Sequence, residues 1–326
     1  MTKLAFFAYI CILGIAIKEN ENFIAVVFMA SFWDIQRKNK LYSYALVGAM
    51  IPIVIVLVWF AGYIFDGGSW IFPFAIALSL IYSIGGYYYG DKIVLSASGA
   101  KLAEGKDFTY LNNVCEGLSL AAGIPTPKLY VMNDSSPNAF ATGRDPKHAS
   151  IAVTTGLMQK MNRSEIEGVI AHEMSHIKNF DIKFMTAVVV LVGLISIIAE
   201  MMGRMFWFGR GNDRGGKNGL LLIIGIFLVI FGPLMAQLVR LAISRKREFL
   251  ADASAAQLTR NPGGLASALE KLKGSPALKK ANDATAPLFI SDPSGAGEKK
   301  SFFTSVSHLF STHPPLDARI KALKGM

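Results

Sequence analysis

The sequence predicts an α+β protein, in which about four transmembrane helices in two hairpins carry a mainly helical domain with a small β-sheet. Charged residues make up only 17% of the 326 residues, whereas globular domains average about 25%. Long apolar runs alternate with polar segments, and the polar segments contain helix-capping residues and alternating strand patterns. These observations indicate that some apolar surface faces lipid and some forms the core of a water-exposed domain.

Four apolar runs are long enough to cross a bilayer, which takes about 20 apolar residues. They cover residues 42–65, 70–90, 184–206 and 219–243. The segment 37–40 before the first run is rich in Lys and Arg, and the turn at 66–69 contains neither. The positive-inside rule therefore places the N-terminal flank, and the chain after two crossings, in the cytoplasm.

The loop between the third and fourth runs fits this rule less well. It carries four basic residues, which the rule would not place outside: Arg204, Arg210, Arg214 and Lys217. A shallow or re-entrant second hairpin therefore stays open beside a fully spanning one.

The formal net charge of +10 would suit a nucleic-acid partner, but the sequence contains no groove-reading motif. Many of the basic residues lie beside the apolar runs, where they favour anionic lipid. We therefore expect a lipid bilayer as partner and no nucleic acid. The two cysteines, Cys11 and Cys115, are too few for a disulfide framework, and we expect Cys115 to be a small buried residue.

The polar segments predict mixed secondary structure. An amphipathic helix is expected over 107–122, ended by Gly123. The sequence patterns predict a strand at 128–132, a strand pair at 138–143 and 149–158, and helices over 263–273 and after 313–315. Asn162 or Ser164 can cap a further helix, with Glu165 in its first turn. Its expected buried face is Ile166, Val169, Ile170, Met174 and Ile177.

The motif "AHEMSH" lies in this capped helix. His172 and His176 are one turn apart on one helix face, so both imidazoles can bind a single tetrahedral ion. Glu173 lies about 100° around the helix from His172 and can reach a water on that ion without binding the ion itself. Because a catalytic zinc needs three protein ligands, the sequence must supply one more.

The best candidate for the third ligand is Glu248, in "SRKREFLADASAAQ". Asp252 follows it by one helical turn and can hold the second nitrogen of a histidine ligand. The longer pattern H-E-x-x-H-x-x-G-x-x-H fails, because Asn179 and Ile182 replace its glycine and third histidine. An alternative is that the short motif occurs by chance and that the two carboxylates merely solvate nearby Arg and Lys, but the combination of features disfavours it.

With these motifs, the chain resembles the HtpX-like membrane zinc metallopeptidases, relatives of the CAAX prenyl endopeptidases. The resemblance covers about residues 30–326 and rests on separated motifs in a fixed order. These are "NAFATG" (138–143), "IAVTTGLM" (151–158), "AHEMSHIKNFD" (171–181), "SRKREFLADASAA" (244–256) and "STHPPLDARI" (311–320).

The resemblance implies a zincin-type catalytic domain of the gluzincin class, with one Zn2+ per subunit. His172, His176 and Glu248 would hold the zinc, and Glu173 would be the general base of an endopeptidase. The family association with stress response and quality control implies damaged or misfolded membrane proteins, or unfolded polypeptides, as substrates. The implied location is the inner membrane, with the site facing the cytoplasm.

The resemblance also implies roles for residues outside the zinc motif. Asn138, Ala139 and Phe140 would align a substrate strand by β-augmentation. His313 and Arg319 would stabilise the oxyanion or close the site. On the residues alone, His313 could equally be an ordinary loop histidine and Asn138 an ordinary turn residue.

Two other functions fit the sequence less well. An intramembrane protease is disfavoured, because the segment around the motif, 162–183, is too charged to lie in a span. A non-enzymatic membrane scaffold or chaperone with structural zinc would need a fourth ligand, and Cys115 is the only cysteine available in the water-exposed part.

The predicted organisation has five parts. They are an N-terminal extension of doubtful status (1–28), the first transmembrane hairpin (29–90), the first catalytic part with the H-E-x-x-H helix (91–183), the second hairpin (184–243) and the second catalytic part with the third zinc ligand (244–326). We expect Met29 to be the natural start, because the basic flank at 37–40 needs no signal in front of it.

Overall fold

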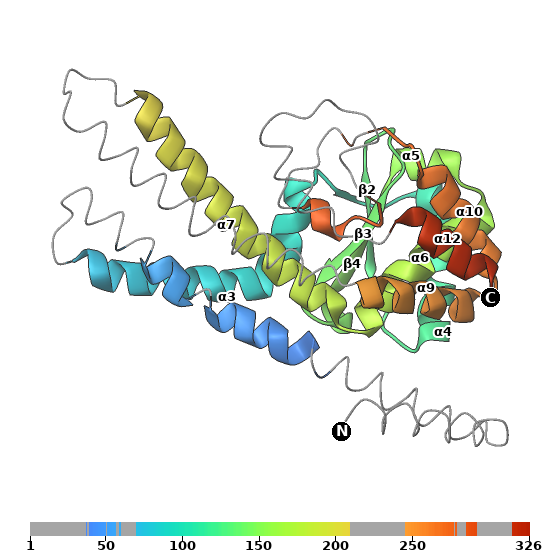
Figure 1. Ribbon diagram of the computed structural model, residues 1–326, viewed down its shortest axis with the longest axis horizontal. Coiled ribbons are helices and arrows are strands. Elements are labelled where there is room, and N and C mark those ends of the chain that lie inside the picture. The colour runs from blue at the N-terminus through green and yellow to red at the C-terminus, as the bar shows by residue number, and fades with distance from the viewer. Residues whose placement is uncertain are drawn as a thin grey trace, which may run out of the picture.

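The computed structural model shows a mainly helical domain built around one small sheet, with long helices projecting from it (Figure 1). It describes residues 37, 39–49, 51–56, 59, 70–208, 245–276, 278, 285–291 and 315–326. The prediction of an α+β fold is confirmed at this level.

The sheet has four strands in the order β1-β2-β4-β3. The strands are β1 (Lys101–Leu102), β2 (Lys128–Met132), β3 (Ala139–Gly143) and β4 (Ala149–Thr154). Strands β2 and β4 pair in parallel, and the other two pairings are antiparallel. Strand β3 is therefore at one edge of the sheet, next to the helix that carries the histidine motif.

The strand predicted over 149–158 is too long. It ends at Thr154, because the hydroxyl of that residue accepts a hydrogen bond from the Leu157 amide and caps a short helix. The strand predicted at 128–132 is confirmed as β2, and the strand predicted from 138 begins one residue later.

The helices of the domain pack around this sheet (Figure 1). They are α4 (Thr109–Ala122), α5 (Thr155–Lys160), α6 (Arg163–Lys178), α9 (Arg245–Thr259), α10 (Pro262–Leu272) and α12 (Leu316–Lys324), with 3-10 turns η2 (Lys106–Phe108), η3 (Pro146–His148) and η4 (Ala286–Leu288). Helix α4 ends where Gly123 takes a left-handed conformation with φ of 68°. Asn162 forms a capping box with Glu165 at the start of α6, as the sequence predicts.

Helix α6 is the centre of the domain core. It contacts α4, α9, α10 and β3, and all five residues of its predicted apolar face are buried. Helix α10 comes close because two glycines remove side chains from the crossing. A Cβ on Gly168 would lie 2.7 Å from the Leu265 nitrogen, and one on Gly264 would lie 2.5 Å from the Ser164 oxygen. This close packing fixes α6 relative to the second half of the domain.

Three long helices lie on the other side of the molecule. They are the helix Asn39–Val56, α3 (Ile71–Ala97) and α7 (Asp181–Phe208). Among the described residues, Asn39–Val56 is the one helix that is by itself long and apolar enough to cross a membrane. Helices α6 and α7 together are also long and apolar enough for one span. They meet at 84°, however, and α6 lies in the domain core. The predicted run at 219–243 lies outside the described residues.

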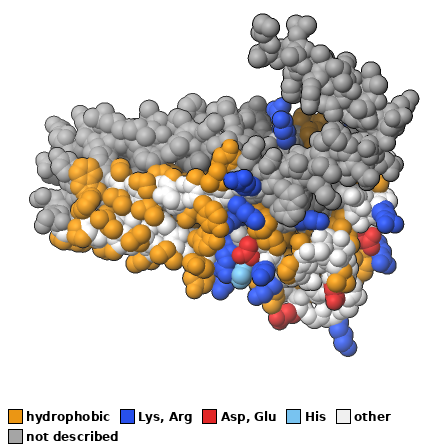
Figure 2. All heavy atoms as spheres, turned by 90° about the horizontal axis from the view of Figure 1, so that it is seen from below, with side chains coloured by type: hydrophobic (Ala, Val, Ile, Leu, Met, Phe, Trp, Pro, Cys, Tyr) orange, Lys and Arg blue, Asp and Glu red, His pale blue; other side chains and the backbone are white. Residues whose placement is uncertain are grey.

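Helix α3 is apolar over much of its exposed surface. On the face shown in Figure 2, apolar side chains cover much of the described surface of the elongated part, and Lys and Arg gather near its junction with the domain. The large exposed apolar side chains of α3 are Phe72, Phe74, Ile76, Leu78, Leu80, Ile81, Ile84, Tyr88, Tyr89 and Ile93. A patch of this kind is unusual on a monomer in water and marks an interaction surface.

Candidate active site

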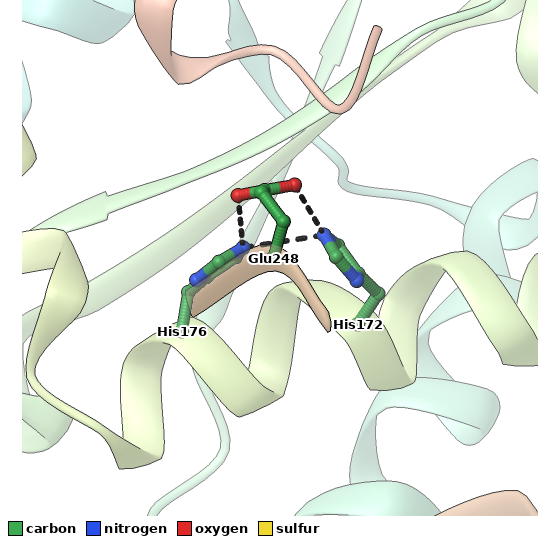
Figure 3. A group of neighbouring side chains, drawn as sticks. All are labelled: His172, His176 and Glu248. Carbon is green, nitrogen blue, oxygen red and sulfur yellow. Dashed lines mark hydrogen bonds and ion pairs between the residues drawn. The ribbon is translucent and has the colours of Figure 1, made fainter. Parts of the chain in front are cut away.

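Three predicted side chains converge below the sheet. His172 and His176 project from one face of α6, and Glu248 reaches them from α9 (Figure 3). The Nε2 atoms of the histidines are 3.2 Å apart, and the Glu248 oxygens lie 3.5 Å from His176 Nε2 and 3.7 Å from His172 Nε2. Within the described part of the chain, this is the only group of three or more such side chains that could hold a metal ion.

The donor set fits a tetrahedral zinc ion. Two nitrogens bound at about 2.0–2.1 Å to one tetrahedral centre lie roughly 3.3 Å apart, close to the 3.2 Å between these imidazoles. One carboxylate and two imidazoles would leave a fourth position for water. Cys115, the one cysteine that a four-ligand structural site could use, is buried elsewhere, with its sulfur 4.0 Å from the Pro127 oxygen.

Asp252 orients the first histidine. Its carboxylate lies 3.0 Å from His172 Nδ1, which leaves Nε2 free to face the metal position. Burial alone would raise the pKa of Asp252, but hydrogen bonds from Arg319 and His172 hold it well below its ordinary value. Burial and the positive charge of Arg319 lower the pKa of His172, which favours the neutral imidazole that a metal requires.

Asp181 orients the second histidine, a role that the sequence reasoning missed. Its carboxylate lies 3.0 Å from His176 Nδ1. The two are brought together by Phe180, whose φ of 59° ends α6 and turns the chain so that α7 begins at Asp181. A left-handed conformation is costly for a residue other than glycine, so this turn is held by its surroundings.

The same carboxylate connects the site to the first long helix. Asn39 Nδ2 donates to Asp181 Oδ1 at 2.6 Å and to the Asn179 carbonyl at 3.0 Å. Arg247 Nη1 lies 3.8 Å from Asp181 Oδ1. Burial would lower the pKa of His176, but Asp181 and the nearby carboxylates raise it to about 9, so metal binding has to displace a proton.

Glu173 is buried beside this group, with 2% of its surface exposed. Burial raises its pKa to about 7, with help from the negative charge of Glu248 and against the positive charges of His176 and Arg319. A carboxyl group with a pKa near neutrality is suited to accept and return a proton. A metal ion nearby would lower this pKa, because it stabilises the carboxylate.

The arrangement can be compared with known proteins. Residues 105–326 match the model of Peptidase family M48. The chain belongs to peptidase family M48. It is therefore a metalloprotease, as the resemblance in its motifs implied, and the prediction that it is a hydrolase is confirmed.

Close relatives of this M48 member extend over nearly the whole chain. Two proteins named Protease HtpX homolog, from Caldanaerobacter subterraneus subsp. tengcongensis and Dictyoglomus thermophilum, are 44% identical over 91% of this chain and over 98% and 95% of their own lengths. One from Streptococcus gordonii is 41% identical over 88% of this chain and 97% of its own. The crystal structure of S. mikatae Ste24p has a TM-score of 0.45 at 18% identity, covering 90% of this chain and 67% of its own.

Arg319 of this M48 domain is fully buried and belongs to the same cluster. Two of its nitrogens bind both oxygens of Asp252, at 2.8 and 2.6 Å, and Nη1 lies 3.2 Å from Glu248 Oε2. The proposal that Glu248 and Asp252 only solvate surface cations is therefore wrong, because both carboxylates are buried. His313, the other residue of the C-terminal motif, lies outside the described residues.

The residues expected to align a substrate are also close to the site, but they are covered. Asn138, Ala139 and Phe140 are at most 2% exposed. The Phe140 ring packs edge-on against Phe289 with centroids 5.1 Å apart. No local pattern in the sequence predicts that another part of the chain lies here.

Proposed function

We propose that this M48 protease is a membrane-embedded, zinc-dependent endopeptidase that cleaves damaged or misfolded membrane proteins on the cytoplasmic side. The observation that carries the proposal is the convergence of His172, His176 and Glu248, with the buried carboxyl group of Glu173 on the same helix. Three ligands and a neighbouring base are what a hydrolytic zinc site needs, whereas a structural zinc usually has four protein ligands.

Each residue has a separate task in this mechanism. When bound, zinc lowers the pKa of a water molecule towards about 7 and polarises the scissile carbonyl. Glu173 accepts the proton of the attacking water and passes it to the leaving amine. Asp252 and Asp181 hold the Nδ1 atoms of the two histidines, which keeps each Nε2 directed at the ion.

A membrane location is supported by the long helices. The apolar surface of α3 and the span-length helix Asn39–Val56 favour two crossings that form the first hairpin, and α7 with the run at 219–243 would form the second. Basic and aromatic side chains pair near the base of these helices: Lys40 with Phe180, Lys92 with Tyr89, Arg144 with Tyr88, and Lys183 with Tyr44. Residues of these types concentrate at membrane interfaces, and an excess of Lys and Arg favours the cytoplasmic side.

The position of the site suggests the class of substrate. Helix α7 begins five residues after His176, so the zinc ligands lie close to the level at which the helices enter the membrane. Loops and tails of membrane proteins are the polypeptides that reach this level most readily. We therefore infer membrane proteins, and unfolded segments of them, as substrates.

Glu173→Gln tests the proposal, measured on detergent-purified protein beside the wild type. We expect about one zinc per chain in both proteins, and cleavage of casein or of a membrane protein only in the wild type. The amide is similar in size to the carboxyl group but cannot accept the proton. Undiminished cleavage by Glu173→Gln would refute the role of the base, and a wild type that retains zinc in a closed four-ligand site would favour a scaffold.

A further inference from the structure

The free edge of β3 is occupied by a segment of the same chain. We call residues Leu288–Ser291 the strap. The backbone N–H of Ile290 donates to the Ala139 carbonyl at 3.0 Å, on the side of β3 that faces away from β4. The strap therefore continues the sheet by one hydrogen bond, at the position where a substrate strand would add.

The Asn138 side chain binds both backbone polar groups of the next strap residue, Ser291. Its Nδ2 donates to the Ser291 carbonyl at 3.1 Å, and its Oδ1 accepts from the Ser291 N–H at 3.4 Å. On the strap, this paired contact involves only backbone atoms, so any residue of an extended peptide could make it. Asn138 is therefore equipped to hold a peptide strand rather than a particular side chain.

The strap also reaches the zinc-binding cluster. Arg319 Nη1 lies 3.3 Å from the Ile290 carbonyl and 3.2 Å from Glu248 Oε2. One guanidinium nitrogen thus contacts both a backbone carbonyl of the strap and a proposed zinc ligand. Arg319 therefore links the Ile290 carbonyl to the zinc-binding cluster.

Two backbone amides on this edge of β3 donate to side chains of the protein. The Ala139 N–H donates to Asn138 Oδ1, and the Gly143 N–H donates to Thr186 Oγ1. An incoming peptide therefore does not find these two amides free, and it competes with the strap for the Ala139 carbonyl. Two strands cannot use the same Ala139 carbonyl and the same Asn138 side chain.

The side chains of the strap are apolar and almost fully covered. Phe289 packs against Phe140, and Ile290 lies in the main core of the domain, each with 2% of its surface exposed. Neighbouring residues of an extended segment point to opposite faces, so the surroundings of the strap are apolar on both of its faces.

We propose that Ala139, Asn138 and Arg319 form a backbone-reading groove for extended peptides with large apolar side chains, and that the strap fills it as an internal pseudosubstrate. Cleavage then requires the strap to leave, and a peptide that binds must displace it. This inference rests on the proposed peptidase function, because it assigns the groove to the substrate of that site. It limits cleavage to segments that compete with the strap.

Ile290→Pro tests the proposal, because proline lacks the N–H that donates to Ala139. Phe289 has φ of −71° and ψ of 145°, the extended conformation that a residue before proline adopts. We expect cleavage of a soluble fluorogenic peptide to rise about fivefold to tenfold, the factor of one hydrogen bond. Ile290→Val, which keeps the N–H and an apolar branched side chain, is the matched control and should stay near wild type.

A second measurement does not depend on cleavage. Hydrogen exchange of residues 286–291 is followed in the zinc-loaded Glu173→Gln variant. The measurement is made without peptide and with a peptide that has the same sequence as the fluorogenic substrate but carries no fluorophore. Displacement predicts that the Ile290 amide, protected in the free protein, exchanges faster when the peptide binds. Ser291→Pro, which removes the N–H bound by Asn138, should make the same segment exchange faster without peptide.

The outcomes separate the two proposals. If the wild type cleaves but Ile290 stays protected with peptide bound, and Ile290→Pro cleaves no faster than Ile290→Val, the strap is a permanent part of the fold and the inference is wrong. If neither the wild type nor Ile290→Pro cleaves any peptide, the proposed function fails. In that case faster exchange on peptide binding would still support the groove, and unchanged exchange would overturn it.

Discussion

At the scale of single residues, the site depends on how two imidazoles are oriented. Each histidine is held at Nδ1 by a carboxylate, Asp252 for His172 and Asp181 for His176, both at 3.0 Å. These contacts fix the direction of each ring before a metal arrives, and they keep the ring proton on Nδ1 when Nε2 binds the metal. The carboxylates therefore contribute to zinc affinity although neither would touch the ion.

Asp181→Asn should weaken zinc binding by about 10–100-fold, because the amide supports the orientation and basicity of His176 poorly. The dissociation constant is measured by competition with a zinc chelator. Asp145→Asn is the matched control, since Asp145 accepts from His148 at 2.8 Å but lies outside the cluster. Equal zinc affinities for the two variants would contradict the role of Asp181.

Much of this cluster could be predicted from local spacing, and part of it could not. The i, i+4 spacing of His172 and His176, and of Glu248 and Asp252, places each pair on one helix face before any tertiary structure is known. Asp181 depends on the left-handed turn at Phe180, which no periodicity indicates. An aspartate five residues after the second histidine, at the end of the helix, was the available signal.

At the scale of elements, the domain depends on how closely α10 approaches α6. Gly168→Ala should destabilise the domain by about 1–3 kcal/mol, because the new Cβ would clash with the backbone of Leu265. Gly117→Ala is the matched control. Gly117 lies in α4 with no atom within 4 Å of its added Cβ, so alanine should stabilise by about 0.5–1 kcal/mol. Thermal unfolding in detergent measures both, and a stable Gly168→Ala would show that the crossing can relax.

The start of α6 should make the domain sensitive to acid. Burial would raise the pKa of Glu165, but hydrogen bonds from Lys271, Ser267 and the Asn162 amide lower it. Its folded pKa is therefore below its unfolded value, so its contribution is present at neutral pH and is lost as the pH falls below about 4.3, through the folded pKa. Stability falls at low pH because protonation of this buried carboxylate weakens the hydrogen bonds that it accepts.

Glu165→Gln should therefore reduce stability at neutral pH by roughly 1 kcal/mol, and the difference from wild type should shrink as the pH falls through this range. Unfolding is followed by circular dichroism at a series of pH values. Glu167→Gln, on the exposed side of the same helix, is the control and should change stability little. A pH-independent difference for Glu165→Gln would contradict this explanation.

The elements themselves followed closely from sequence where local signals were strong. Asn162 with Glu165 predicted the start of α6, and Gly123 predicted the end of α4. Strand β4 was predicted too long, because β-branched residues continue into Thr155 while the Thr154 side chain already caps α5. The strap could not be predicted, because its pairing with β3 joins residues about 150 positions apart through one backbone contact and one side chain.

At the scale of the whole molecule, the proposed membrane location requires α3 to face lipid. Ile81→Lys tests this, since Ile81 is 68% exposed and a lysine in water would be harmless there. In a bilayer the same change costs about 2.5–3.5 kcal/mol near the centre of a span, and should reduce the folded protein recovered from membranes. Leu120→Lys is the matched control. Leu120 lies in α4 of the domain and is 78% exposed, so this variant should be recovered normally. Equal recovery of both would contradict a membrane position for α3.

The overall layout was predictable in kind from composition and from the order of the apolar runs. Two of the four predicted spans coincide with the described helices α3 and α7, and part of a third coincides with Asn39–Val56. The count of four, the domain boundaries and the side of the membrane stay predictions. They depend on insertion in a bilayer, which hydropathy and charge indicate only indirectly.

The central claim is that two histidines and one glutamate hold a zinc ion that keeps a water molecule. X-ray absorption at the zinc edge, on the zinc-loaded protein, tests it most directly. We predict nitrogen and oxygen neighbours only, at about 2.0–2.2 Å, with two imidazoles, one carboxylate and one exchangeable water, and loss of zinc in Glu248→Ala. A sulfur neighbour at about 2.3 Å, or an unchanged zinc spectrum in Glu248→Ala, would contradict it.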